Sequence, residues 1–440
     1  MKLIHTTASV RPGVSPRACH AAALLVAGVG IIVAAAACDT SRLLDVSTPN
    51  NVPVALLNTP ANASLMVNST VTDFECAFGS AVLVEGIISD ELGDAQLGAA
   101  GWPYDRRDAN TQTNGIYGGN GCNSAQNPGI YTPLATARWD ADHAVKNLTT
   151  WTDAQVPNRK LLLAQSNLYA GFSYAMMGVS MCGAAFDLGP QVDQKGMFAL
   201  AEQRFTAAIA GGQAAGNTDI VNAAYVGRAR VRLYQGNTAG AATDAGLVPP
   251  GFVYNATFDE SNSRRYNRVF SATAQFGDYT VEAQSRNLTT ENGEVDPRSK
   301  SLLTTTRPAD AKTPIWVPAK YAGGDAVPIP MAAYEEAQLI VAEVQGGTAA
   351  VGIINGMRST VGLMPYTGAT DAASIKALVI DERRRVLFGD GLRNYDIERF
   401  NIPFNPPVGT PFPIKGGTYG NTTCLPLPDV ERFNNPNIGS

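Results

Sequence analysis

The stretch Val231–Val248, VRLYQGNTAGAATDAGLV, contains the turn that decides the fold. Its centre, QGNTA at residues 235–239, recurs as QGGTA at residues 345–349. Gly236 and Gly346 can end one helix in the left-handed backbone conformation. Thr238 and Thr348 can cap the helix that follows. Ala-rich faces on both sides let the paired helices approach closely, so each stretch predicts a helical hairpin.

Further helices are indicated by apolar residues at three-and-four spacing over 132–151, 158–181 and 196–212. Two regions break this pattern: residues 93–130 are rich in Gly, Asn and aromatic residues, and residues 249–329 are polar and rich in Tyr. We therefore predict an all-α fold. Tetratricopeptide-like helix pairs would pack against a loop-rich region with few short strands. We assign residues 61–440 to a single domain.

The first 37 residues predict a targeting segment. They carry three basic residues and no acidic ones, and Ala21–Ala37 is a run of 17 small and apolar residues. Such a run fits a signal-peptide core better than a spanning helix of about 20 residues. It ends at Cys38 after small residues, which resembles the lipobox of bacterial lipoproteins, although Ala35 stands where Leu is usual. We predict lipidation of Cys38 and a lipid-anchored tether over residues 38–60; ordinary secretion with cleavage nearby is the alternative.

Charge and histidine content exclude several classes of function. The net charge of −5 becomes −8 when the three basic residues of the leader are removed. An electrostatic footprint for nucleic acid is therefore missing. Outside the leader only His143 remains, which excludes a histidine metal cluster and leaves a Ser-His-Asp triad dependent on that one residue. We expect His143 to be structural, and we expect no metal and no cofactor.

Four cysteines besides Cys38 remain in the mature chain, and no CxxC motif is present. An even number in an exported protein predicts two disulfides, for which the sequence allows three connectivities. We favour Cys76–Cys122, which flanks one loop-rich insertion. The second bond would then join Cys182 to Cys424, which ties a helix end to the C-terminal tail.

The stretch Asp381–Phe400, DERRRVLFGDGLRNYDIERF, holds ten charged residues, five of each sign, in a chain that is 16% charged. On a helix, Glu382 and Arg385 lie one turn apart. Arg393, Asp396 and Arg399 then share one face of a second helix. Because every acid has an arginine nearby, we favour a partly buried structural network over a catalytic cluster.

A second acidic stretch, Ser89–Asp94 (SDELGD), lies where a helix gives way to a loop. Asp90, Glu91 and Asp94 could be paired glycosidase carboxylates, calcium ligands or solvated charges at a helix end. We favour solvated charges at a helix end over catalytic carboxylates. We still predict that Asp90 contacts a ligand at the mouth of the loop.

Several stretches, in their order along the chain, resemble the SusD/RagB family of outer-membrane nutrient-binding lipoproteins. The charged stretch above matches the family's Glu-Arg-Arg…Gly-x-Arg-x-x-Asp-x-x-Arg signature. Met331–Tyr334 depart from the family, which has an Arg ahead of its Leu-Ile-x-Ala-Glu helix. The other matching stretches are LLDVSTPNNV, AQSNLYAGFSYAMMGVSMCGAAFDLGP, VDPRSK with Asp296, Pro297 and Arg298, AKYAGGDAVPIPMAAYEEAQLIVAEV, INGMRSTVGL and CLPLPDVERFNNPN.

The resemblance implies helix pairs packed against a loop-rich ligand face. It also implies a location at the outer membrane, lipid-anchored and facing the cell exterior, and a SusC-like TonB-dependent transporter as partner. The function that it implies is binding of glycans or other oligomeric nutrients without chemistry on them.

Sugar binding requires a flat aromatic platform with amide, carboxylate or guanidinium partners around it. One loop supplies that chemistry, and we expect the Cys76–Cys122 bond to preorder it. The alternative is that buried aromatic rings only hold long loops in place. The candidate ligand-binding residues are Asp90, Trp102, Tyr104, Arg106, Asn110 and Tyr117, with Tyr266, Trp316 and Tyr321 completing the face.

Two other functions compete with nutrient binding. A helical-repeat scaffold lipoprotein that binds protein partners in the cell envelope would show the same helix pairs and anchor, but the long aromatic loops favour a nutrient. A glycosidase would need an acid–base pair, and none is recognisable, so we do not expect an enzyme.

Overall fold

The computed structural model describes residues 54–96, 98, 101–110, 114–413 and 416–438. The predicted signal peptide and Cys38 lie outside these residues, as does most of the predicted tether. Residues 55–440 form one compact unit. Its main helices are α4 (Ala63–Ile88), α7 (Tyr131–Thr150), α8 (Arg159–Ser180), α9 (Gln194–Ala215), α10 (Thr218–Tyr234), α11 (Thr238–Ala245), α13 (Tyr334–Gln345), α14 (Gly347–Thr360), α15 (Ala372–Val386) and α16 (Arg393–Phe400).

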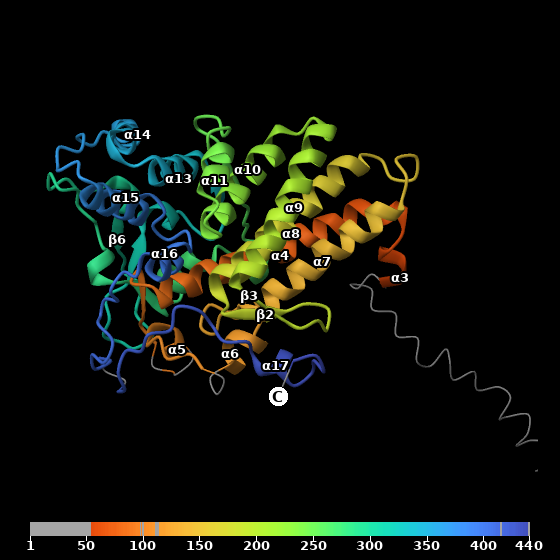
Figure 1. Ribbon diagram of the computed structural model, residues 1–440. Helices are drawn as coiled ribbons and strands as arrows, with labels where there is room; N and C mark the ends of the chain where they lie inside the picture. The colour runs from red at the N-terminus through yellow and green to blue at the C-terminus, as the bar shows by residue number, and fades with distance from the viewer. Residues whose placement is uncertain (1–53, 97, 99–100, 111–113, 414–415, 439–440) are drawn as a thin grey trace, which may run out of the picture. The chain divides into compact units, whose positions relative to one another are not determined.

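Antiparallel helix packing organises the first half of this unit. α8 packs against α7 and α9, α9 packs against α10, and α4 lies against α7 and α8 (Figure 1). Gly171 and Gly178 explain how closely α9 approaches α8. A Cβ at either position would lie within 2.7 Å of a ring atom of Phe205 or Phe198. The prediction of a mainly helical fold is confirmed.

The two predicted hairpins are present as α10–α11 and α13–α14. Gly236 has φ +83° and Gly346 has φ +62°, so both turns use a backbone that favours glycine. The predicted caps are wrong, however. Asn237, not Thr238, caps α11 by accepting a hydrogen bond from Gly240 N. Helix α14 begins at Gly347, ahead of Thr348, and has no side-chain cap.

The described strands are short and form antiparallel pairs. They lie mainly in the two loop-rich regions, together with the short helices α5 (Trp102–Asp105), α6 (Asn114–Gly119) and α12 (Arg268–Phe270). Another short helix, α17 (Asp429–Arg432), lies in the C-terminal segment. A four-residue helix, α3 (Val54–Leu57), precedes α4. The pairs are β1 (Leu92–Asp94) with β5 (Tyr279–Val281), β2 (Gly183–Ala185) with β3 (Gln191–Asp193), β4 (Val253–Ala256) with β8 (Ile329–Ala333), and β6 (Ser301–Leu303) with β7 (Trp316–Pro318).

Helix α4 is the centre of the core. Every residue from Phe74 to Ile88 is buried, which fits a helix surrounded by protein on all sides. Phe74 and Phe78 stack on each other, and Phe74 also meets Tyr169 of α8 edge-on. The C-terminal end of α4 leads directly into β1, so the core helix positions the first loop-rich region.

Candidate ligand-binding surface

Two disulfides fix the loops to the helical core. Cys76 of α4 is bonded to Cys122, with 5.6 Å between their Cα atoms. Cys182, just after α8, is bonded to Cys424 in the C-terminal segment, with Cα atoms 5.0 Å apart. These are the two pairs that the sequence analysis favoured. Each bond restricts a long loop in the unfolded chain and so stabilises the folded one.

The first loop-rich region is held down by tyrosines that we expected to bind ligand. Tyr104 is 1% exposed, and its hydroxyl donates to the carbonyl of Pro128 at 2.7 Å. Tyr117 is completely buried. Neither ring offers a face to a ligand, so the interpretation as a platform is corrected for both. A loop rich in Gly and Asn has few apolar side chains, and these two rings supply its contact with the core.

Asp90 and Tyr321, also proposed as ligand contacts, belong to buried polar networks. Both oxygens of Asp90 accept from Arg393, at 2.9 and 3.1 Å. Burial raises the pKa of Asp90, but Arg393 and Arg384 outweigh this effect and hold the pKa below its ordinary value. Tyr321 is 1% exposed and donates to Asp390 at 2.6 Å. In this structure both residues already have their partners inside the protein.

The charged stretch Asp381–Phe400 forms a buried network, as the structural interpretation predicts. Asp396 accepts from Arg383 at 2.7 Å and from Arg399 at 2.8 Å. Glu382 is fully buried and accepts from Arg298 and Arg358. The bonds of Asp396 join α16 to α15, and those of Glu382 join α15 to Arg298 and Arg358 outside this stretch. Together they occupy the carboxylates that a catalytic interpretation would need.

Arg107 is a structural residue that the sequence analysis missed. Its guanidinium lies between the rings of Phe404 and Tyr419, at 4.6 and 4.7 Å from their centroids. It also donates to the carbonyl of Pro406 at 2.6 Å. Arg107 therefore fastens the segment around residues 404–420 onto the first loop-rich region. Nothing in the sequence distinguishes it from Arg106 next to it.

Arg106 and Asn110 are more accessible than the tyrosines. Arg106 forms an ion pair with Asp108 at 3.3 Å and donates to the carbonyl of Gly416. Asn110 is exposed, and its amide donates to the carbonyl of Asp108. The two residues therefore lie together around Asp108. The side chain of Trp102 lies outside the described part of the structure, and its role in ligand binding stays a prediction.

Trp316 in β7 is a half-buried ring with a cationic neighbour. The guanidinium of Arg286 lies 5.1 Å from the ring centroid, a cation–π arrangement. Leu303, its partner across the β6–β7 pair, is exposed. The backbone N of Trp316 donates to the hydroxyl of Thr280 in β5. Arg286 carried no signal in the sequence because its loop has no motif.

Strand β5 contacts both Trp316 and the start of the first loop-rich region, through side chains on its two opposite faces. Gly101, just before α5, lies so close to β5 that a Cβ there would be 2.6 Å from the hydroxyl of Tyr279. Thr280, the next residue of β5, holds Trp316. The start of α5 and Trp316 thus contact adjacent residues of one strand.

Tyr266 belongs to another part of the molecule. It is half-buried and follows Arg265, which donates to Glu75 of α4 at 2.8 Å. Glu75 and the end of α4, where β1 begins, are about 20 Å apart at 1.5 Å per residue. The structure therefore does not gather all the predicted residues into one site. We define the candidate ligand-binding surface as Trp316 with its cation–π neighbour Arg286 and its cross-strand neighbour Leu303; Arg106 and Asn110 form a separate group around Asp108.

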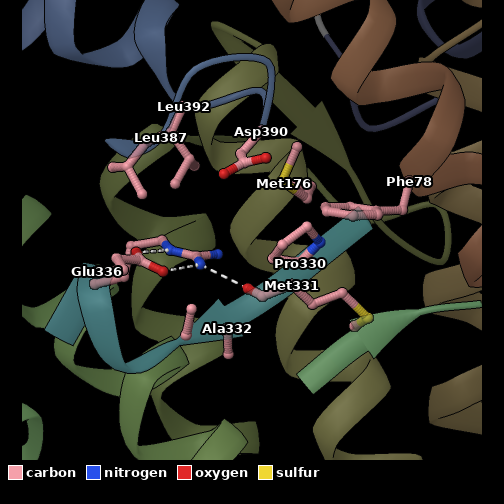
Figure 2. A pocket seen from close by; sticks show the side chains of 11 residues that line it. Phe78, Met176, Pro330, Met331, Ala332, Glu336, Leu387, Asp390 and Leu392 are labelled. Carbon is pink, nitrogen blue, oxygen red and sulfur yellow. Dashed lines mark hydrogen bonds and ion pairs between the residues drawn. The ribbon is translucent and has the colours of Figure 1, made fainter. Parts of the chain in front are cut away.

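A small cavity lies between α4, α8, β8 and α13 and is closed by the segment that joins α15 to α16. Figure 2 shows its lining, in which Arg230 forms a buried ion pair with Glu336 and also donates to the carbonyl of Met331. Its volume is about 20 Å³, room for about one water molecule. This cavity is a structural feature of the core, too small for a sugar.

Two features are absent from the described part of the chain. None of the helices there is both long and apolar enough to cross a membrane. Within the same residues, no group of three or more His, Cys, Asp or Glu side chains could hold a metal ion.

Known proteins match this chain in their structures but not in their sequences. No protein-family model matches the chain, and no curated protein matches its sequence. Solved structures do match. A SusD superfamily protein from Bacteroides vulgatus aligns with a TM-score of 0.63 at 15% identity, covering 86% of this chain and 98% of the other. A laminarin-binding SusD-like protein aligns with a TM-score of 0.56 at 15% identity, covering 87% and 98%.

The class of fold is thus an all-α arrangement of stacked helix pairs with loop-rich regions packed against them. More particularly, the chain has the fold of the SusD superfamily, as the motifs in its sequence had indicated. The matches extend over nearly the whole length of the solved structures.

Proposed function

We propose that this protein is a lipid-anchored, non-catalytic binding protein of the outer membrane that captures glycans and passes them to a TonB-dependent barrel transporter. The observation that carries the proposal is the shared fold. It covers 86% of the chain and is the fold of a SusD-like carbohydrate-binding protein from Bacteroides vulgatus. Fold likeness at 15% identity does not transfer a ligand, so the argument for glycans also rests on the candidate surface.

The candidate surface has the chemistry that a sugar needs. The indole of Trp316 supplies an apolar plane, and Arg286 supplies donors for hydroxyl groups. Arg286 and Trp316 are already stacked, so little side-chain entropy is lost when a sugar binds. A non-catalytic role is supported by the charged stretch, in which Asp396 is paired with two arginines and Glu382 with three.

Trp316→Ala should weaken glycan binding at least tenfold, or about 1.4 kcal/mol, with little change in melting temperature. The reason is the loss of the indole plane from an already half-exposed position. Binding would be measured by calorimetry against laminarin, starch and xylan oligosaccharides, beside an assay for newly released reducing ends.

Tyr225→Ala is the matched control, because Tyr225 is also half-buried and has Arg228 5.8 Å from its ring, but on α10. It should bind like the unaltered protein. Release of reducing ends would show a glycosidase. Failure of every glycan to bind, with capture of an envelope protein instead, would favour the scaffold function.

The membrane anchor and the transporter are separate parts of the proposal. The anchor rests on the apolar leader that ends in small residues before Cys38, and the transporter rests on the resemblance of the sequence to the SusD/RagB family. Mass spectrometry of the mature protein from the membrane fraction should find a diacylglyceryl-modified Cys38 at the N-terminus. An unmodified N-terminus at another residue would reject the anchor and leave the glycan-binding proposal standing.

A further inference from the structure

We propose a second saccharide subsite, on the outer face of α7 and separate from the candidate surface around Trp316. It is a groove of about 300 Å³ between α7 and α17. This volume is at the lower end of the range for small-molecule sites. The inference rests on the proposed glycan-binding function. The groove is lined by Tyr131, Thr132, Ala135, Thr136 and Trp139 of α7 and by Val430 and Glu431.

Trp139 is the reason to expect a ligand here. Its ring is 46% exposed, although the rest of α7 buries its apolar residues against the core. Large aromatic rings at the surface are typical of binding sites. Trp139 is also fixed in place. Its ring stacks on that of His143, with 4.7 Å between centroids and 9° between planes. His143 is itself bonded to Asn58 at 2.7 Å.

The geometry of the helix directs the free side of the indole toward the groove. His143 is one turn C-terminal to Trp139 and covers one face of the ring. Ala135 and Thr136 are one turn N-terminal, and both line the groove. The groove therefore begins on the side of the ring that His143 leaves uncovered. A rigid, flat and apolar wall of this kind suits the C–H face of a pyranose.

The opposite wall supplies polar groups and is also anchored. Glu431 is half-buried and accepts a hydrogen bond from Asn435. It has the capacity to accept further bonds from sugar hydroxyls. The start of α17 packs closely on α6 (Figure 1), where a Cβ at Gly118 would lie 2.5 Å from Pro428. The Cys182–Cys424 bond fixes the segment leading into α17.

The charge of the groove narrows the class of saccharide. None of the lining residues that the structure describes is Lys or Arg, and Glu431 brings a negative charge. An anionic saccharide would be repelled, so the expected ligand is a neutral sugar chain. A groove of this size would hold one or two rings of such a chain.

The test compares Trp139→Ala with the unaltered protein against neutral oligosaccharides and against oligogalacturonate, an anionic chain. Trp139→Ala should weaken binding of the neutral chains at least fivefold and leave the melting temperature unchanged. Glu431→Gln is a second variant, expected to weaken binding twofold or more. Leu247→Ala removes an exposed apolar side chain after α11 and should change nothing.

The outcomes separate the two proposals. If no neutral or anionic glycan binds to the unaltered protein, the proposed function and this subsite both fail. If glycans bind to the unaltered protein and Trp316→Ala weakens that binding, but Trp139→Ala and Glu431→Gln bind glycans normally, only the proposal of a second subsite fails. A protein partner would then be the ligand to seek for the groove. Tighter binding of oligogalacturonate than of the neutral chains would overturn the assignment to neutral sugars.

Discussion

Asp396→Ala should lower the free energy of unfolding by about 3–5 kcal/mol, because it leaves the buried guanidinium of Arg383 without its carboxylate. Asp396 is 3% exposed and accepts from Arg383 and Arg399, one at each oxygen. Burial raises its pKa, but the two arginine charges outweigh burial and hold the pKa below its ordinary value. Urea unfolding followed by circular dichroism at pH 7 measures the loss.

The same stretch offers a matched control. Asp381 also pairs with an arginine, Arg385, at 2.5 Å, but its side chain is 46% exposed. Asp381→Ala should therefore cost no more than about 1 kcal/mol. Adding Arg383→Met to Asp396→Ala should recover part of the larger loss, since it removes a stranded charge. Equal losses for Asp381→Ala and Asp396→Ala would contradict the buried network. Lost ligand binding with unaltered unfolding would instead indicate an active-site role.

The network explains how the loops keep their positions. Asp90, at the end of α4, bonds to Arg393 of α16, and Glu382 of α15 bonds to Arg298 in the second loop-rich region. Asp390 bonds to Lys320 and Tyr321, just after β7. The half-buried Trp316 is thus carried on a strand whose neighbours are fixed by ion pairs. A rigid support of this kind keeps a binding ring oriented before the ligand arrives.

Local features could be predicted from the sequence. A glycine turn between two apolar-patterned helices is determined within about twenty residues, so both hairpins were found. The motif order also pointed to the correct fold. The capping residue was wrong at Thr238 because Asn237 beside it is an equally good cap. The prediction that Thr348 caps a helix was wrong because α14 already begins at Gly347.

Partners far apart in the sequence could not be predicted. Asp90 and Arg393 are separated by 303 residues, and nothing local tells a buried acid from one at a loop mouth. Tyr104 and Tyr117 have the same sequence context whether their rings face the core or a ligand. Trp139 fits the three-and-four pattern of α7, so its exposed ring and the groove beside it became visible only in the structure.

Glu85 and Glu91 should make the protein less stable as the pH rises from 6 to 9. Both are buried near the end of α4, and burial raises the pKa of each to about 8. Glu85 accepts from the amide of Asn394 at 3.0 Å, and Glu91 from the backbone N of Gly389 at 3.2 Å. An ordinary Glu in the unfolded chain has a pKa of about 4.3. Between these values the folded state holds protons that the unfolded state has released.

Stability from these two groups is therefore complete below about pH 4 and is lost as the pH rises through 8. For each group the slope reaches at most about 1.4 kcal/mol per pH unit and acts mainly between pH 6 and 8, so we expect the two groups together to lose about 5 kcal/mol between pH 6 and 9. The double variant Glu85→Gln/Glu91→Gln mimics the neutral acids. It should match the unaltered protein near pH 4, and its advantage in urea unfolding should grow from pH 6 to pH 9. Glu260→Gln, at an exposed position, should follow the unaltered protein at both pH values. A double variant that loses as much stability at pH 9 as the unaltered protein would mean that these carboxyl groups are already charged in the fold.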